Sequence, residues 1–282
     1  MAEPMQQTPT QQDTIHQDAA LRDVRARSFG SIAEHYARYR PAPPPDAVDW
    51  ILPKPCEMAL DLGAGTGALT AQVASRSSHV VAAEPDPGMR AVLVRQVTQA
   101  GVVGAVAEAI PLRSGCMDAV VASSAWHWMQ HEVALVEVAR VLHSGGSLGV
   151  LWNSVDRSID WVVAMFGPRR AISEEDRGSP DSRRPLDPDL EPSTHDHHRL
   201  ELPDSAPFHD LESKVVEWSK SLTVDEIVGL AGTYSRVIVL SEQRKSALLE
   251  RARRLAVDRL EETGGSAIDV PMRCQCFRAV RD

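Results

Sequence analysis

The feature that most restricts the fold of this chain is the segment MALDLGAGTGALTAQ, residues 58–72. Its apolar start ends in Asp61 and runs directly into a turn with three glycines, Gly63, Gly65 and Gly67. Glycines at this spacing allow a sharp turn from a strand into a helix, and they let a ligand approach main-chain N–H groups closely. The segment therefore predicts a strand–turn–helix unit that binds a ligand with a nucleoside end.

Strands and helices are expected to alternate from residue 58 to residue 153. The expected strands are short apolar runs at 58–62, 79–83, 102–106, 117–122 and 147–152. The expected helices between them cover 68–76, 88–99 and 131–142. Each connection between parallel strands must cross over the sheet, so this alternation predicts a parallel sheet with helices on both faces.

The remaining segments extend this plan toward both ends of the chain. Towards the C-terminus we expect a strand at 211–222, a capped helix at 223–232, a long amphipathic helix at 241–262 and an alternating strand at 267–277. Near the N-terminus, a helical stripe with Ile32, Tyr36 and Tyr39 precedes a short helix at 46–52 that Asp46 should cap. In the alternating strand, Cys274 and Cys276 share the apolar face, which favours buried structural thiols over a metal or redox pair.

The domain plan follows from where this periodicity begins and ends. Residues 1–27 are polar and aperiodic and are expected to form a disordered tail, and 28–282 form one domain. Within it, 28–155 is the expected cofactor-binding core, 156–207 a variable lid or loop, and 208–282 the part that completes the sheet.

Charge and hydropathy limit the classes of partner. The formal net charge is −9, whereas a nucleic-acid-binding surface needs clustered Lys and Arg, so no nucleic-acid partner is expected. The first twenty residues lack an apolar run, and no run elsewhere is long enough to cross a bilayer. We therefore expect a cytoplasmic protein, monomeric or homodimeric, that acts on a small molecule.

The end of the second expected strand supports the nucleoside interpretation. The run HVVAAEPD places Glu84 where, in a sheet of this type, an acidic side chain can accept both ribose hydroxyls. The alternative is that Glu84 only caps the helix that follows. A glycine turn and an acid at the end of the next strand are together more specific than the glycine pattern alone.

Five stretches give the sequence a family resemblance: YARYRPAPP, DLGAGTGALT, VAAEPDPGMR, VAEAIPLRSGCMDAVVASSAWHWM and VARVLHSGGSLGVLWN. They resemble the class I S-adenosylmethionine-dependent methyltransferases of the "methyltransferase type 11" group, and among these the small-molecule enzymes similar to trans-aconitate methyltransferase. The resemblance implies a Rossmann-like methyltransferase fold: doubly wound α/β, with a mostly parallel seven-stranded sheet and an antiparallel last strand. It also implies methyl transfer from S-adenosylmethionine, with S-adenosylhomocysteine as product, to a carboxylate or hydroxyl oxygen.

The resemblance implies a role for each matching residue. Asp61 would hold the methionyl amino group, directly or through water, and Glu84 the ribose. The other residues expected near the cofactor are Gly63, Ala64, Gly65, Thr66 and Gly67 in the turn, Pro85 and Met89 after the second strand, Ala107 and Glu108 on the adenine side, Ser123 and Ala125 near the methionyl group, and Tyr36 and Arg40 in an N-terminal lid.

Some of these assignments have structural alternatives. Many relatives place an Asp two residues before the position of Glu108, where this chain has Val106, so adenine recognition would fall to backbone groups or to Glu108. Met89 can equally be a core residue. Tyr36 and Arg40 can equally lie on a helix surface beside the proline-rich turn.

The candidate for the catalytic residue is His127 in SSAWHWMQ, because its ordinary pKa suits proton removal near neutral pH. Alternatively it is a structural residue between Trp126 and Trp128. With a carboxylate acceptor no base is needed, and His127 would orient or pair with the substrate. Trp152 and Trp161 could line an acceptor pocket or simply pack in the core.

Three further interpretations concern a metal site, another enzyme class and a catalytically silent protein. The run His195, Asp196, His197, His198 favours a solvated loop over a metal site, because adjacent ligands seldom converge on one ion, and no metal is expected. An NAD-dependent oxidoreductase could share the glycine turn, but Asp61 and the downstream HSGG favour a methyltransferase. A catalytically silent, methyltransferase-like protein that binds S-adenosylmethionine is the other alternative.

Overall fold

A computed structural model describes residues 29–167 and 198–282 of the chain. The expected N-terminal tail, much of the variable segment and the residues His195, Asp196 and His197 lie outside the described residues.

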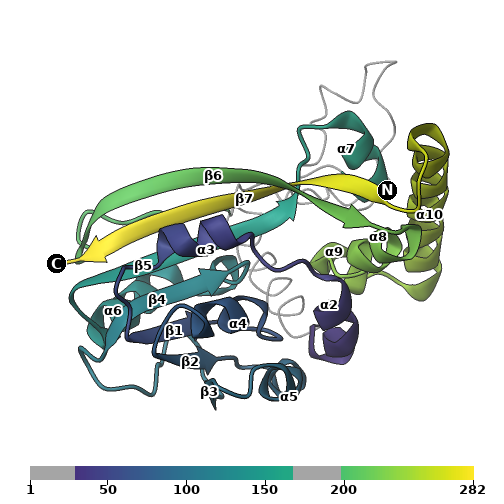
Figure 1. The fold of residues 1–282 in the computed structure, drawn as a ribbon. Helices are drawn as coiled ribbons and strands as arrows, with labels where there is room; N and C mark the ends of the chain where they lie inside the picture. The colour runs from purple at the N-terminus through teal and green to yellow at the C-terminus, as the bar shows by residue number, and fades with distance from the viewer. Residues whose placement is uncertain (1–28, 168–197) are drawn as a thin grey trace, which may run out of the picture.

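Seven strands form one sheet in the order β3-β2-β1-β4-β5-β7-β6 (Figure 1). Their bounds are Met58–Leu62 (β1), His79–Ala83 (β2), Gly101–Val103 (β3), Met117–Ser123 (β4), Leu142–Val155 (β5), Phe208–Leu222 (β6) and Ile268–Arg281 (β7). The first five pair in parallel, while β7 pairs antiparallel with both β5 and β6. The predicted fold class, with its antiparallel last strand, is confirmed.

Helices cover both faces of this sheet. Their bounds are Phe29–Ile32 (η1), Ala33–Tyr39 (α2), Pro45–Ile51 (α3), Ala68–Ala74 (α4), Pro87–Gln96 (α5), Trp126–Trp128 (η2), His131–Val141 (α6), Asp160–Phe166 (α7), Val224–Ala231 (α8), Ser235–Ile238 (α9) and Glu242–Thr263 (α10). The period of two in β1 explains the two layers, because Leu60 faces the cluster that includes α6, and Ala59 faces the cluster that includes α3 and α4. The alternating chain order thus produces a doubly wound arrangement.

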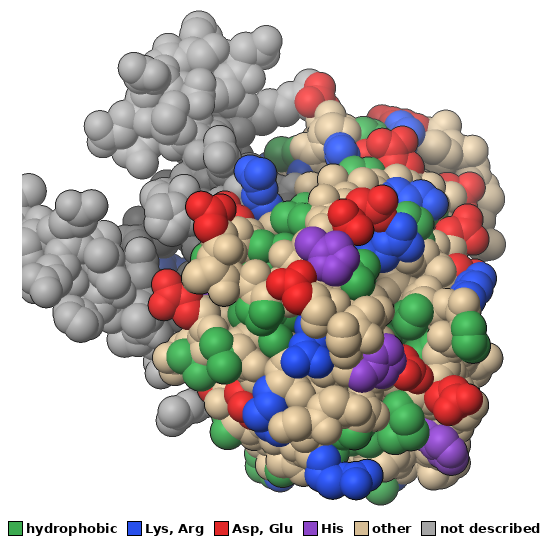
Figure 2. Space-filling model, turned by 90° about the vertical axis from the view of Figure 1, so that its left-hand side faces the viewer, with side chains coloured by type: hydrophobic (Ala, Val, Ile, Leu, Met, Phe, Trp, Pro, Cys, Tyr) green, Lys and Arg blue, Asp and Glu red, His purple; other side chains and the backbone are tan. Residues whose placement is uncertain are grey.

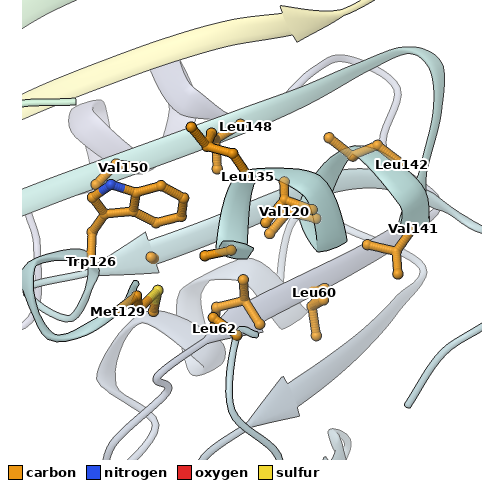
Figure 3. Packing of buried hydrophobic residues seen from close by; sticks show 14 of the residues in the cluster. Leu60, Leu62, Val120, Trp126, Met129, Leu135, Val141, Leu142, Leu148 and Val150 are labelled. Atoms are coloured by element: carbon orange, nitrogen blue, oxygen red, sulfur yellow. The ribbon is translucent and has the colours of Figure 1, made fainter. Parts of the chain in front are cut away.

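The cluster on the α6 side is the largest part of the core. Leu60 from β1, Val120 from β4 and Leu148 from β5 are fully buried and converge on this side of the sheet (Figure 3). Trp126, which lies in η2 beyond the end of β4, is also fully buried and closes the cluster. The loop that carries His127 is therefore anchored by the side chain that precedes it.

The C-terminal half adds a second lobe. The ribbon of β6 and β7 extends past the parallel strands, and α7, α8 and α10 pack at its far end (Figure 1). The Thr223 side chain caps α8 in a capping box with Glu226, as the sequence predicted for a capped helix. Cys274 and Cys276 are fully buried, as predicted, and no residue group suited to a metal ion occurs within the described ranges.

Three local predictions were wrong in detail. Asp46 does not cap α3, because Pro45 is already the first helical residue and the capping position falls on Pro44, which has no side-chain acceptor. The strand β3 ends at Val103 rather than at residue 106. In contrast, β5 reaches Val155, because β7 pairs with it as far as Met272.

Charges of both signs are mixed on one face of the molecule (Figure 2). On the face shown in Figure 2, Lys and Arg side chains are interspersed with Asp and Glu rather than gathered in one stripe. Among the helices in the two described ranges, none is both long and apolar enough to cross a membrane.

Leu148→Ala tests the role of the α6-side cluster. Leu148 is fully buried, so its truncation should lower the free energy of unfolding by about 2–5 kcal/mol. Val136→Ala is the control, because Val136 on α6 is 64% exposed and its loss should cost less than about 0.5 kcal/mol. Urea denaturation of both variants measures the difference, and equal effects would contradict this packing.

Candidate functional site

The candidate site lies where the strand order reverses direction. From β1 the chain continues to β2 on one side of the sheet, whereas β4 lies on the other side of β1. In open α/β sheets, ligands bind beyond the carboxyl ends of the strands at such a point. The turn after β1 and the loop after β4 meet here, since a Cβ added at Gly63 would lie 2.6 Å from the Cβ of Ala125.

The glycine turn has the backbone geometry that its sequence predicted. Gly63, Gly65 and Gly67 all have positive φ, of 64°, 58° and 94°. The N–H groups of Gly63 and Ala64 both donate to the Ala83 carbonyl at the end of β2. A Cβ at Gly67 would lie 2.5 Å from Leu93, whereas one at Gly65 would meet nothing within 4 Å. Gly65 is therefore the glycine that borders open space.

Asp61 is a buried carboxylate with one unused oxygen. Its side chain is fully buried, and Oδ2 accepts a hydrogen bond of 2.7 Å from the Thr70 hydroxyl on α4. Its Oδ1 is buried and has no hydrogen-bond partner. Burial, together with the nearby charge of Glu84, raises the pKa of Asp61 from 3.8 to about 7, although the Thr70 hydrogen bond opposes the shift. Such an oxygen is suited to accept from a cationic ligand.

Glu84 holds the turn from the next strand. One carboxylate oxygen accepts from the Gly65 N–H at 2.8 Å and the other from the Asp86 N–H at 2.8 Å. Glu84 is 7% exposed, and burial raises its pKa although these hydrogen bonds act against the rise. Glu84 therefore also positions the turn, and does not cap α5, because Asp86 makes that capping contact with the Met89 N–H.

The rest of the predicted cofactor residues near the turn surround these two acids. Thr66 and Ala64 are buried within the turn itself. Pro85 separates Glu84 from Asp86, and its carbonyl accepts from Arg90. The structure thus brings the glycine turn, both acids and the start of α5 into one cluster.

The predicted lid residue Tyr36 packs against α5. Tyr36 and Met89 belong to one hydrophobic cluster, in which Met89 is 4% exposed. The Phe29 ring lies edge-on to Tyr36 at 5.6 Å and to Trp128 at 6.1 Å. The N-terminal helix therefore bridges the cofactor side of the site and the loop after β4. Met89 contacts this helix, as its core interpretation allowed.

The adenine-side residues lie along the loop after β3. Ala107 is buried in the large core, while Val106 is 44% exposed. The Glu108 carboxylate accepts from the N–H of Gln130 at 2.6 Å. Glu108 thus ties this loop to the start of α6.

The residues after β4 follow a strained turn. Ser123 ends β4 and is half-buried, and the next residue, Ser124, has φ of 53°, a conformation that costs energy for a residue with a side chain. The turn delivers Ala125, which is 8% exposed, against Gly63. No sequence pattern had indicated Ser124.

His127 lies among aromatic rings. Its ring centroid is 4.4 Å from that of Trp128 and 5.6 Å from that of His198. Its Nδ1 accepts a hydrogen bond of 3.2 Å from the indole N–H of Trp152, which is 2% exposed. The expectation that His198 belongs to a solvated loop was wrong, because His198 is half-buried against His127 and Trp152.

Comparisons with known proteins agree with this geometry. The profile of a methyltransferase domain family matches residues 60–150. An uncharacterized methyltransferase of Mycobacterium tuberculosis is 35% identical over 252 residues, which cover 89% of this chain and 95% of that protein. An uncharacterized methyltransferase-like protein of Schizosaccharomyces pombe is 28% identical, over 79% of this chain and 83% of its own length.

The chain belongs to the S-adenosylmethionine-dependent methyltransferases. The solved structure of a candidate type II methyltransferase from Anaeromyxobacter dehalogenans has the same fold, with a TM-score of 0.58 at 19% identity over 86% of this chain and 98% of that one. The family expected from the sequence is thereby confirmed, and nothing in the comparisons supports the NAD-dependent alternative.

Other predicted and unpredicted residues of this methyltransferase lie outside the glycine turn. Arg40 does not contact the glycine turn; its guanidinium reaches the Asn153 carbonyl and the ring of Tyr234. Trp161 packs in the C-terminal lobe with Arg259 over its ring. Sequence reasoning missed Thr70, although a Thr on the apolar face of α4, nine residues after Asp61, was a usable signal.

The state of Asp61 leads to a prediction about pH and stability. Asp61 has its ordinary pKa of 3.8 in the unfolded chain and a pKa of about 7 in the folded chain. Between these two pH values the folded chain therefore holds an extra proton. The stability of the ligand-free protein should therefore fall as pH rises across this interval, by at most about 1.4 kcal/mol per pH unit.

Asp61→Asn is the comparison variant, because its side chain can still accept from Thr70 and carries no proton to lose. Chemical denaturation over the same pH range should give a flatter stability profile for Asp61→Asn. Identical profiles for the two proteins would show that Asp61 titrates normally.

The Trp152 contact leads to a prediction about the tautomer of His127. An indole nitrogen only donates, so the acceptor Nδ1 must be unprotonated and the neutral ring must carry its proton on Nε2. Nitrogen-15 NMR of the neutral His127 should show this tautomer. Trp152→Phe removes the donor and should allow both tautomers, whereas a wild-type ring protonated on Nδ1 would contradict the hydrogen bond.

Proposed function

We propose that the cluster after β1 and β2 binds S-adenosylmethionine and that the protein transfers its methyl group to an oxygen of a small molecule. In this proposal Asp61 holds the methionyl ammonium group and Glu84 the ribose hydroxyls. The backbone of Gly63, Gly65 and neighbouring turn residues borders the cofactor between them. Tyr36 covers it from the N-terminal helix.

The unpartnered Oδ1 of Asp61 is the observation that carries this proposal. A buried acceptor without a donor costs free energy, and such atoms are uncommon in folded proteins. An ammonium group would supply both a donor and a positive charge, which would favour the ionised carboxylate. The donor set therefore fits a ligand with a cationic amino group at this end of the crevice.

Glu84 fits the sugar end of the same ligand. Each of its carboxylate oxygens accepts one backbone hydrogen bond, and an ionised carboxylate offers about four acceptor sites in all. Each oxygen therefore retains capacity for one hydroxyl donor. The open space beside Gly65 lies next to this carboxylate.

The chemistry requires alignment more than acid or base strength. When bound, the sulfonium cofactor supplies an electrophilic methyl group, whose bond to sulfur breaks as the bond to the acceptor oxygen forms. Holding the reacting groups in line can contribute about 7–11 kcal/mol. In this proposal the close approach of Gly63 to Ala125 holds the loop after β4 against the glycine turn, and so fixes the acceptor side relative to the cofactor.

His127 in this proposal orients the acceptor as a hydrogen-bond donor. Its Nδ1 accepts from Trp152, so the neutral ring carries its proton on Nε2 and has no lone pair left to act as a base. A carboxylate acceptor carries no proton that must leave, and it would accept from such a donor. This role differs from general-base catalysis, which would require the Trp152 hydrogen bond to break.

Asp61→Ala tests the proposal through calorimetric binding of S-adenosylhomocysteine. Removal of a charged hydrogen-bond partner should weaken binding by about tenfold to a hundredfold. Asp49→Ala is the matched control, because Asp49 is 44% exposed and pairs with Arg76 on the surface. Near-normal affinity in Asp61→Ala, or equal losses in both variants, would refute the assigned site.

A further inference from the structure

Three arginines surround one tyrosine beyond the end of β5. The guanidinium carbons of Arg40, Arg157 and Arg236 lie 4.8, 4.9 and 5.7 Å from the centroid of the Tyr234 ring. These residues come from the end of α2, from the segment after β5 and from α9. The fold thus concentrates positive charge at one place in a chain whose formal net charge is −9.

Neutral groups hold Arg40 and Arg157 in position. Arg157 donates to the Gly167 carbonyl at 3.0 Å and to the Ser154 hydroxyl at 3.0 Å. Arg40 donates to the Asn153 carbonyl at 3.4 Å. Within the described ranges, no carboxylate oxygen lies within 4.0 Å of Arg40 or Arg157. Their positions are therefore fixed while their charges are not neutralised by an ion pair.

The Tyr234 hydroxyl is a second unsatisfied group at the same place. Its oxygen is buried and no donor lies within 3.5 Å at hydrogen-bonding angles, but the Arg157 guanidinium is close enough to act on it both by charge and as a hydrogen-bond donor. Burial alone would raise the pKa of Tyr234, but Arg157, Arg40 and Arg236 outweigh it and hold this pKa below its ordinary value. A hydroxyl in this state is a strong hydrogen-bond donor.

The arginine–tyrosine cluster lies at the edge of the sheet where the methyl acceptor must bind. Figure 1 shows α2, α8 and α9 gathered beyond the arrowhead of β4, the side to which the parallel strands point. Asn153, near the end of β5, ties the cluster to the sheet: its side chain donates to the Pro41 and Ala42 carbonyls and accepts from the Trp218 indole. Trp152, the residue before it, donates to His127.

We propose that Arg157 and the Tyr234 hydroxyl, with Arg40 and Arg236 beside them, bind an oxyanionic group of the methyl acceptor, a carboxylate or a phosphate. This inference rests on the proposed function. A guanidinium group matches the two oxygens of a carboxylate or phosphate with parallel hydrogen bonds, and such charge-assisted bonds are about twice as strong as neutral ones. The hydroxyl supplies a further donor.

The site would anchor the acceptor rather than activate it. Hydrogen bonds and positive charge withdraw electron density from an oxyanion and make its oxygens poorer nucleophiles. The group held by Arg157, which is surrounded by positive charge, is therefore a poorer nucleophile than a second oxygen of the acceptor. The acceptor class that fits is a small molecule with an anionic anchor and a second oxygen nucleophile, such as a dicarboxylate or a hydroxy acid.

The experiment is calorimetric titration of the protein loaded with S-adenosylhomocysteine. The probes are succinate, citrate and inorganic phosphate, with succinamide as the neutral control. At least one oxyanion should bind, and Arg157→Gln should weaken that binding by about tenfold or more. Tighter binding of the carboxylates or of phosphate identifies which oxyanion the acceptor carries.

Tyr234→Phe is the conservative variant. It keeps the ring beneath the guanidinium groups and removes a buried hydroxyl without a donor or acceptor partner, so the variant should fold with unchanged or greater stability. Its affinity for the oxyanion should fall by about threefold to tenfold. Arg253→Gln is the matched arginine control, because Arg253 pairs with Asp225 at the surface of α10. It should bind the probes as the unmodified protein does.

Three outcomes would overturn the inference. If S-adenosylhomocysteine binds but no oxyanion does, the acceptor site is wrong while the proposed cofactor site stands. If Arg157→Gln and Tyr234→Phe weaken the binding of S-adenosylhomocysteine by the same factor as the binding of the oxyanion, the cluster holds the cofactor's own carboxylate. If the unmodified protein binds no S-adenosylhomocysteine, the proposed function fails, and this inference with it.

Discussion

The arrangement of this methyltransferase depends on two carboxylates buried at the ends of adjacent parallel strands. Burial raises the pKa values of both Asp61 and Glu84, and the charge of Glu84 adds to the rise in the pKa of Asp61. The structure stabilises them with hydrogen bonds from Thr70 and from the glycine turn, and one oxygen of Asp61 stays without a donor. The sheet, the helices and the strained turn after β4 together hold these two acids at the strand-order reversal.

Much of this could be predicted because it is local. A strand that ends in an acid, a turn with three glycines and a helix are encoded within fifteen consecutive residues, and the positive φ of Gly63, Gly65 and Gly67 follows from their lack of a side chain. The burial of Cys274 and Cys276 could also be predicted, because the period of two in the last strand is a local pattern. Patterns of this kind depend on neighbours in the sequence rather than on the rest of the fold.

The proposed acceptor site could not be predicted because distant segments build it. Arg40, Arg157 and Tyr234 are separated by more than seventy residues at each step, and no local pattern relates them. His198 lay in a polar, aperiodic stretch, yet it packs against His127 and Trp152. The same holds for the tautomer of His127, which is set by a residue on β5. Such residues can be recognised only once the structure shows that the fold brings them together.

In the proposed function, Asp61 and Glu84 hold the two ends of a nucleoside that carries a cationic amino acid. A crystal structure of the protein grown with S-adenosylhomocysteine is the direct test. We expect the ligand's ammonium group at Oδ1 of Asp61 and its ribose hydroxyls on the carboxylate of Glu84, with the backbone of Gly65 alongside. A ligand bound elsewhere, or a crevice that stays empty at saturating ligand, would contradict the proposal.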